Sequence, residues 1–314
     1  MARTIAAQAL VPRFRRAARA SDDHVVIPEP PVALPPGRLL HVPGRGEFFV
    51  RDTGPAEGGS DAGTVLLLHG WMFAADLNWF TTYDDLHAAG HRVIAMDLRG
   101  HGRGLRTPEP FRLQDCADDA AAVLEALDAG PAIVVGYSLG GAVTQLVARH
   151  HPGIVTGIVL CATANDWSER RLRLLWSGMS GLRLLLGLSP EGIWRRVMVL
   201  MGEEGGRGTD WQAAELGRGS SVSIAEAGRE LGRFDSRPWN GSLTVPSAVV
   251  VTRDDTTVPP RKQHALAKSL GAPTFEAPGT HGAVTMLPET FNPVLLKALA
   301  TVAAAAERRA PTAA

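Results

Sequence analysis

One short stretch of the chain constrains its fold more than any other. Residues 132–141 read Ala-Ile-Val-Val-Gly-Tyr-Ser-Leu-Gly-Gly, so a run typical of a buried strand passes into a Gly-x-Ser-x-Gly turn. A helical pattern follows over residues 139–150. On such a corner the hydroxyl of Ser138 would project above a sheet, and the flanking glycines would let strand and helix pass without Cβ clashes. The same motif occurs in plain turns, but its place between strand and helix favours a nucleophilic serine.

A nucleophilic serine needs a base, an acid that orients the base, and donors for an oxyanion. Asp254 and Asp255 follow a predicted strand at residues 248–251, and His281 follows another at residues 274–276. Both groups therefore lie at the carboxyl ends of strands, where a doubly wound sheet places its catalytic residues. The order Ser, Asp, His is one of several that build a catalytic triad.

Two backbone N–H groups are candidates for the oxyanion donors. Trp71 follows the predicted buried strand at residues 65–68 and a Gly turn, and Leu139 comes directly after the candidate nucleophile. The predicted helix that begins at Leu139 would also direct its N-terminal N–H groups toward the space above Ser138.

Three other titratable residues near strand ends are interpreted as structural. Asp97 and His101 belong to a Gly-rich turn, in which the carboxylate would accept hydrogen bonds from loop N–H groups. His69 precedes Gly70, and we expect it to shape the loop through a backbone hydrogen bond rather than to transfer protons.

These residues together resemble the α/β-hydrolase fold family, over about residues 37–305. The motifs that carry the resemblance, in order and in spacing, are His69-Gly70-Trp71, Asp97-Leu98-Arg99-Gly100-His101-Gly102, Gly136-Tyr137-Ser138-Leu139-Gly140-Gly141, Asp255-x-x-Val258-Pro259 and His281. The serine motif resembles the esterase, lipase, perhydrolase and C–C hydrolase branches, whereas dehalogenases and soluble epoxide hydrolases carry Asp at this position. The family pattern places the acid four residues before the Pro of Val-Pro, which selects Asp255. Thr280 departs from the family, which commonly has Gly before the histidine.

Strand and helix patterns alternate along most of the chain, which predicts an α/β fold with a doubly wound, mostly parallel sheet. The predicted strands comprise residues 65–68, 92–96, 132–135, 154–160, 248–251 and 274–276, and the predicted helices residues 83–89, 113–127, 139–150, 261–270 and 288–305. Two short strands at residues 38–42 and 47–51 predict a hairpin at the edge of the sheet.

The alternation stops between about residues 165 and 243, where several apolar segments have helical spacing. A structureless loop of this length is implausible inside a compact domain. In the resembled family an insertion here forms a lid, so residues 165–243 are interpreted as a helical lid whose Trp176 and Trp194 contact substrate. The alternative is a helical layer that only stabilises the sheet. The rest of the chain is predicted to divide into a disordered Arg- and Pro-rich lead-in (1–36), an α/β-hydrolase core (37–164 and 244–305) and a disordered tail (306–314).

Composition gives little indication of macromolecular partners. The formal net charge is zero, which leaves no electrostatic footprint for nucleic acid. The first 20 residues lack an apolar run long enough for a signal sequence; their arginines allow a membrane-surface contact as an alternative to disorder. Cys116 and Cys161 are the only cysteines and are expected to be buried thiols in a reducing, cytoplasmic compartment.

The resemblance implies a serine hydrolase that cleaves carboxylic esters with an apolar moiety through an acyl-enzyme. Its triad would be Ser138, His281 and Asp255, with the N–H groups of Trp71 and Leu139 as oxyanion donors. No metal or cofactor is expected, and the partner is a small-molecule ester. The alternatives are a perhydrolase or C–C bond hydrolase with the same triad, and a ligand-binding receptor of this fold without turnover.

Overall fold

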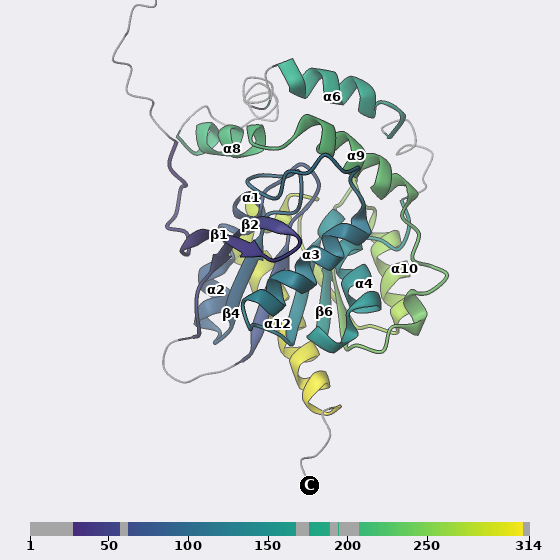
Figure 1. Cartoon of the computed structure of the whole chain (residues 1–314). Coiled ribbons are helices and arrows are strands. Elements are labelled where there is room, and N and C mark those ends of the chain that lie inside the picture. Colours follow the sequence, from purple (N-terminus) through teal and green to yellow (C-terminus); the bar gives the residue numbers. More distant parts are fainter. Residues whose placement is uncertain (1–27, 57–61, 168–175, 189–193, 195–206, 310–314) are drawn as a thin grey trace, which may run out of the picture.

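An eight-stranded sheet forms the centre of the computed structural model, which describes residues 28–56, 62–167, 176–188, 194 and 207–309 (Figure 1). The strands are β1 (Gly37–Val42), β2 (Gly46–Asp52), β3 (Thr64–Leu68), β4 (Arg92–Met96), β5 (Ala132–Tyr137), β6 (Val155–Cys161), β7 (Ser247–Thr252) and β8 (Thr274–Ala277). Their order across the sheet is β1-β2-β4-β3-β5-β6-β7-β8. The first two pairings are antiparallel and the others are parallel. The expected α/β fold with a doubly wound, mostly parallel sheet is confirmed.

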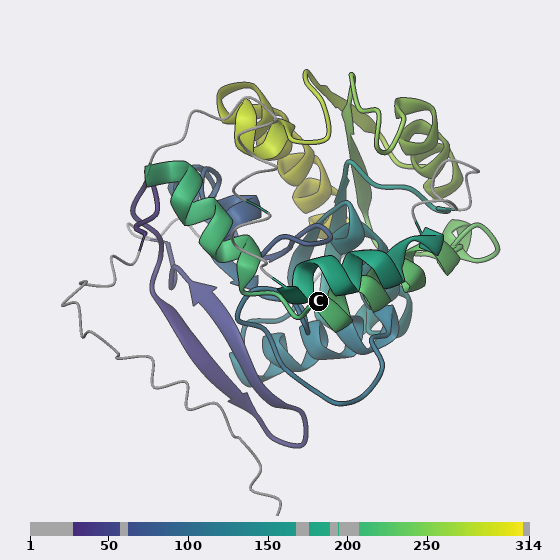
Figure 2. The same cartoon turned by 90° about the horizontal axis from the view of Figure 1, so that it is seen from above.

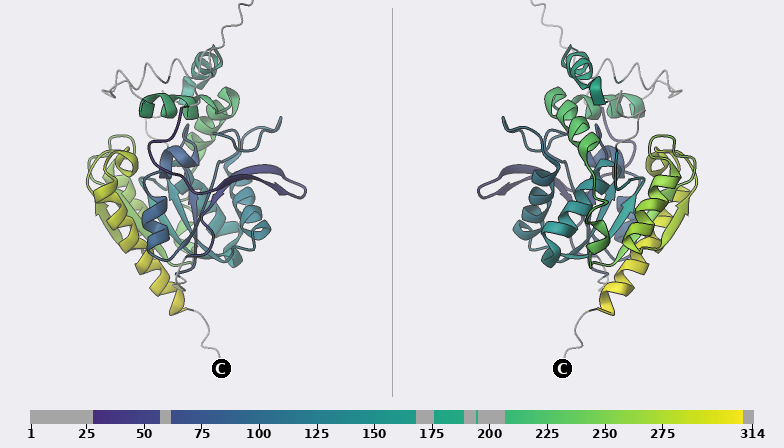
Figure 3. Two further views of the ribbon diagram at one scale, coloured as in Figure 1. Left: turned by 90° about the vertical axis from the view of Figure 1, so that its left-hand side faces the viewer. Right: turned by 90° about the vertical axis from the view of Figure 1, so that its right-hand side faces the viewer.

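The central strands fill two cores, one on each face of the sheet. Leu66 and Leu68 of β3 belong to one core and Val65 and Leu67 to the other, because successive side chains of a strand point to opposite faces. This explains why these strands read as unbroken apolar runs. The first face is covered by α3 (Leu113–Ala126), α4 (Leu139–His150) and α10 (Pro260–Leu270), and the second by α2 (Tyr83–Ala88) and α12 (Pro288–Glu307). Helices therefore flank the sheet on both sides (Figure 3).

Within the part of this interval that the structure describes, three α-helices lie between β6 and β7: α6 (Met179–Leu188), α8 (Arg207–Gly217) and α9 (Ser221–Arg233). We call them the insert helices. They lie across one end of the sheet, at the top of Figure 1, and cover it in the view from above (Figure 2). Two of the apolar segments in this interval, residues 172–176 and 193–201, lie largely outside the described residues.

Outside the insert, every expected strand and helix is present, and the ends agree within two residues. The sequence patterns missed two short helices, α1 (Ala75–Trp79) and α11 (Ala283–Met286), and within the insert they missed α9. Residues 1–27 of the expected lead-in lie outside the described residues, whereas the backbone of Pro36 accepts a hydrogen bond from Asp52 of β2. None of the helices in the described residues is long and apolar enough to cross a membrane.

Apolar contacts dock the insert helices on the rest of the molecule. Two glycines of α9 face aromatic rings: a Cβ atom at Gly228 would lie 2.9 Å from the Trp71 ring, and one at Gly232 would lie 2.4 Å from Cδ1 of Trp176. The rings of Trp71 and Trp176 meet edge to face with centroids 5.3 Å apart. The Gly-x-x-x-Gly spacing thus gives α9 a flat strip on which both indoles pack.

Candidate active site

Ser138 occupies the corner between β5 and α4. Its φ and ψ of 53° and −114° are strained for a residue with a side chain, which is typical of a nucleophile elbow. Two neighbouring glycines permit the corner, since a Cβ at Gly136 would lie 2.3 Å from the Gly140 carbonyl oxygen, and one at Gly140 would lie 2.2 Å from the Leu68 carbonyl oxygen. The Ser138 N–H donates to the Cys161 carbonyl at 2.9 Å and holds the strained backbone in place.

The structure brings the predicted serine, histidine and aspartate together. The Nε2 atom of His281 lies 3.0 Å from the Oγ of Ser138, and its Nδ1 lies 2.7 Å from Oδ2 of Asp255. An ionised carboxylate only accepts hydrogen bonds, so the Nδ1 of His281 carries the proton and its Nε2 is free to accept the serine hydroxyl. This is the arrangement in which a histidine acts as a general base on a serine.

The loop after β7 fixes the carboxylate of Asp255, whose side chain is fully buried. Its Oδ1 accepts hydrogen bonds from the N–H groups of Thr257 and Val258, both at 2.8 Å, and its Oδ2 accepts one from the Thr252 hydroxyl at 2.8 Å. Asp254 instead is exposed, and its carboxylate accepts from the Gly279 N–H at 3.2 Å. Of the two adjacent acids, only Asp255 contacts the histidine among the described residues.

Tyr137, next to the serine, contacts the loop that carries His281. Its hydroxyl donates to the His281 carbonyl oxygen at 2.7 Å, and its ring packs against the imidazole with centroids 5.7 Å apart. No role for this tyrosine was predicted from the sequence, although its position in the Gly-Tyr-Ser motif could have suggested one.

A hollow of about 330 Å³, part of it open to solvent, adjoins the serine and the histidine. Apolar and aromatic groups make up much of its wall; the residues that line it are Gly70, Trp71, Phe73, Asn78, Tyr137, Ser138, His281, Gly282, Val284 and Thr285. Trp176 is not among the lining residues but packs against Gly232 and Trp71.

Trp71 lies in the loop after β3, and Leu139 is the first residue of α4, directly after the serine. Neither N–H has an acceptor within the part of the chain that the structure describes. A residue at the first position of a helix has no intrahelical partner for its N–H, so Leu139 is free to donate. The neighbouring Gly70 N–H is occupied, because it donates to Oδ1 of Asn78 at 3.0 Å.

The other two histidines near the site are buried and have backbone partners. His69 approaches the Gly70 carbonyl oxygen through Nδ1 at 2.8 Å and accepts from the Leu98 N–H through Nε2 at 2.9 Å. Burial lowers the pKa of His69 to about 4 and that of His101 to about 3. Both rings are therefore neutral near pH 7, and His69 shapes the loop through backbone hydrogen bonds, as expected.

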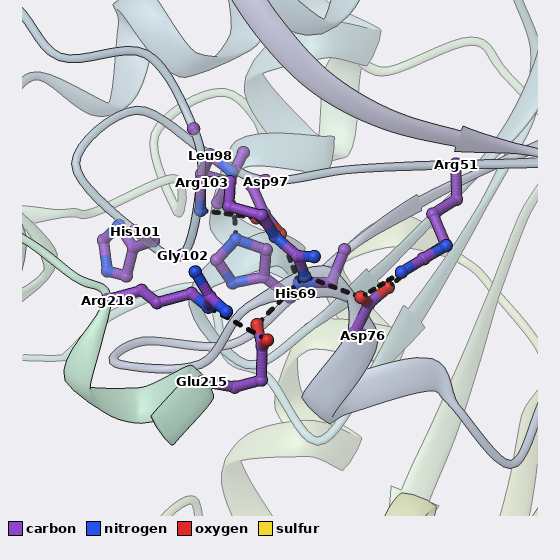
Figure 4. A network of polar contacts seen from close by, with 12 residues as sticks. Arg51, His69, Asp76, Asp97, Leu98, His101, Gly102, Arg103, Glu215 and Arg218 are labelled. Atoms are coloured by element: carbon purple, nitrogen blue, oxygen red, sulfur yellow. Dashed lines mark hydrogen bonds and ion pairs between the residues drawn. The ribbon is translucent and has the colours of Figure 1, made fainter. Parts of the chain in front are cut away.

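Charged groups tie α8 to the loops of the core (Figure 4). Arg103 bonds Asp76 at 2.6 Å and Glu215 of α8 at 2.9 Å, and Asp76 also pairs with Arg51 at 2.6 Å. Burial acts to raise the pKa of Asp76, but the hydrogen bonds and charges of the two arginines outweigh it and lower the pKa. Asp97 accepts from the N–H groups of Ala75 and Arg103, both at 2.7 Å, which matches its expected role in the loop.

No group of three or more His, Cys, Asp or Glu side chains in the described residues is arranged to hold a metal ion. Cys116 and Cys161 are buried free thiols, as expected, and burial raises the pKa of the Cys161 thiol. Neither cysteine lines the hollow beside Ser138.

Comparison with known proteins identifies the family to which this fold belongs. Residues 63–281 match the family model of the α/β-hydrolase fold. The chain belongs to this family. Among curated relatives, a non-heme chloroperoxidase of Streptomyces lividans is 40% identical over 114 residues, which cover 36% of this chain and 40% of that protein. A bifunctional esterase/perhydrolase of Acinetobacter calcoaceticus is 36% identical over 115 residues, which cover 36% of this chain and 40% of that protein.

The chain thus spans about two fifths of the length of these curated relatives. Similarity in structure extends much further along the chain. A thermophilic esterase from Thermogutta terrifontis superposes with a TM-score of 0.70 over 85% of this chain and 99% of that one, at 21% identity. At this identity the likeness concerns the fold alone.

Proposed function

We propose that this α/β hydrolase cleaves carboxylic esters with a small acyl group through a covalent acyl-enzyme. The observation that carries the proposal is the hydrogen-bonded series from Asp255 to His281 to Ser138, which ends beside the small hollow. Apolar groups such as Phe73 and Val284 in the wall favour an apolar acyl chain. The relative named as an esterase/perhydrolase supports the same reaction class.

The proposed reaction begins when His281 takes the proton of the Ser138 hydroxyl while Oγ attacks the ester carbonyl carbon. The N–H groups of Trp71 and Leu139 stabilise the oxyanion that forms. Collapse of this intermediate expels the alcohol, which takes the proton from His281. Water then gives a proton to His281 and attacks the acyl-enzyme, and the carboxylic acid leaves as Ser138 recovers its proton. Asp255 orients the imidazole and stabilises its charged form throughout.

The three insert helices are proposed to act as a lid over this site. They lie across the end of the sheet at which the serine is found, and α9 packs on Trp71, a residue of the hollow's wall (Figure 2). A lid would limit the bulk water around the reacting groups and restrict which esters reach Ser138.

Perhydrolysis is a second candidate, because the relatives include a chloroperoxidase and an esterase/perhydrolase. In that reaction hydrogen peroxide replaces water in the second step, attacks the acyl-enzyme and leaves as a peracid. It uses the same serine, base and oxyanion donors. The ratio of peracid to acid formed from one ester in the presence of peroxide measures this activity directly.

A panel of p-nitrophenyl esters of increasing acyl length, together with a fluorophosphonate probe, tests the proposal. We expect hydrolysis that is fastest on short acyl chains, a probe adduct on Ser138 by mass spectrometry, and loss of at least about 10³-fold in kcat/KM for Ser138→Ala. Ser242→Ala, at an exposed position, is the matched control. Probe labelling without turnover would indicate a binding protein of this fold, and turnover of vinylogous diketones alone would indicate C–C bond hydrolysis.

A further inference from the structure

Asn78 lies in the wall of the hollow, on the short helix α1, and its role is not explained by the triad. The residue is 2% exposed. Its Oδ1 accepts the Gly70 N–H at 3.0 Å, and this hydrogen bond defines which end of the amide is oxygen, since a backbone N–H requires an acceptor. The Nδ2 group is therefore the end of the side chain that remains available to other partners.

This Nδ2 group is buried and has no hydrogen-bond acceptor among the described residues. Leaving a buried amide donor unsatisfied is unfavourable, so buried amides normally have a partner. The nucleophile is close by: a Cβ atom placed on Gly70 would lie 3.4 Å from Oδ1 of Asn78 and 3.5 Å from Cβ of Ser138. Asn78 and Ser138 thus both lie beside Gly70 and line the same hollow.

We propose that Nδ2 of Asn78 donates a hydrogen bond to an oxygen atom in the acyl group of the substrate. The inference rests on the proposed ester hydrolysis and narrows its substrate class to short acyl chains that carry an ether, hydroxyl or keto oxygen near the carbonyl. The acyl group is chosen over the alcohol because it stays attached to Ser138 through both steps, and therefore occupies the small hollow beside that residue.

The oxyanion itself is a less suitable partner for Asn78. The N–H groups of Trp71 and Leu139 already supply two free donors near the serine. A donor to the oxyanion would accelerate every ester equally, whereas a donor to the acyl oxygen discriminates between esters. A site built to hydrogen-bond a substrate group rejects the analogue that lacks it much more strongly than an apolar pocket rejects a missing methylene.

Two esters of equal size isolate this hydrogen bond: p-nitrophenyl methoxyacetate and p-nitrophenyl butanoate, which differ by one oxygen in place of a methylene. The measured quantity is the ratio of their kcat/KM values, divided by the ratio of their rates with hydroxide. We expect this corrected ratio to favour methoxyacetate about tenfold in the native protein, which is the effect expected of one hydrogen bond. On the alcohol side, 2-methoxyethyl acetate and butyl acetate should show no such preference.

Asn78→Asp and Asn78→Ala should each bring the corrected ratio close to one. The first variant keeps an acceptor for the Gly70 N–H and replaces the amide donor by a carboxylate oxygen, so it separates substrate binding from the support of the loop. Asn165→Asp, another buried Asn→Asp change on the loop after β6 and outside the hollow, should leave the ratio unchanged. Because the ratio compares two substrates of one protein, partial loss of folded enzyme does not alter it.

A native ratio near one, or a ratio that Asn78→Asp leaves unchanged, overturns the inference while ester hydrolysis stands. Equal losses on both esters in Asn78→Asp overturn it as well and make Asn78 a positioning residue for the loop of Gly70. A native preference on the alcohol side alone overturns the assignment to the acyl group. Absence of turnover on both esters refutes the proposed function itself, and the inference falls with it.

Discussion

The buried histidines His69 and His101 should make the stability of the fold depend steeply on pH. Burial lowers the pKa of both, to about 4 and about 3, from an ordinary value of 6.5. As the pH falls below 6.5, the unfolded chain binds protons that the folded chain does not accept. The free energy of unfolding is therefore highest above this pH and decreases as the pH falls toward the folded values.

The size of the effect follows from the linkage relation. For one histidine that titrates at 6.5 in the unfolded chain and stays neutral when folded, the free energy of unfolding falls by about 2 kcal/mol between pH 7.5 and pH 5. The result hardly depends on the folded pKa as long as this lies near 4 or below. The two rings together account for about 4 kcal/mol.

The assay is urea unfolding at pH 7.5 and pH 5 of the native protein, of His101→Gln and of His41→Gln, an exposed position on β1. His101→Gln removes one titrating ring, so its difference between the two pH values should be smaller than the native difference by about 2 kcal/mol. His41→Gln should keep the native difference. Buried groups such as His91, Asp97 and Glu215 titrate in all three proteins and cancel in this comparison. An unchanged pH difference in His101→Gln would refute the view that this ring is held neutral by burial.

Three further predictions concern the acid, the insert and its docking. Asp255→Asn should lower kcat/KM on a short ester by about 10³–10⁴-fold, and Asp254→Asn should lower it less than twofold; steady-state kinetics decide, and the opposite ranking would reassign the acid. Trp176→Ala should cost about 3–5 kcal/mol in urea unfolding and affect all acyl lengths alike, whereas a shift in chain-length preference would place this indole against substrate. Glu215→Gln should lower the unfolding free energy by about 2 kcal/mol because it removes a buried carboxylate that pairs with both Arg103 and Arg218, and the exposed-pair control Glu230→Gln by less than 0.5 kcal/mol; equal losses would contradict the burial argument.

The sheet and the elbow could be predicted because their signals are local. The sequence contains, one directly after another, an unbroken β-branched run, a Gly-x-Ser-x-Gly turn and a helical pattern. The strand and the helix are each several residues longer than the one or two residues by which their predicted ends differ from the structure. The approach of His281 to Ser138 was predictable from topology, since parallel strands bring their carboxyl ends to the same edge. The choice of Asp255 over Asp254 had no local signal and depended on the family pattern.

Other parts of the site have no recognisable pattern in the sequence. The helix α1 has five residues, too few to show helical periodicity, and Asn78 was missed with it. The helix α9 contains two glycines that lower its helical propensity, and only the aromatic rings packed against them explain their presence. The apolar composition of the insert could not show whether a tryptophan contacts substrate or packs between helices. Trp176 packs against α9 and Trp71.

The position of Trp71 connects the insert to the chemistry of the site. Its backbone follows Gly70 in the wall of the hollow, while its indole N–H donates to the Ile224 carbonyl of α9 at 2.8 Å and its ring packs on Gly228. A displacement of α9 would therefore pull on the loop whose N–H is proposed to bind the oxyanion. Because Asn78 holds the Gly70 end of the same loop, the loop is fixed from two sides: by a side chain of the core and by the insert. The insert would then influence the rate of acyl transfer as well as access to the serine.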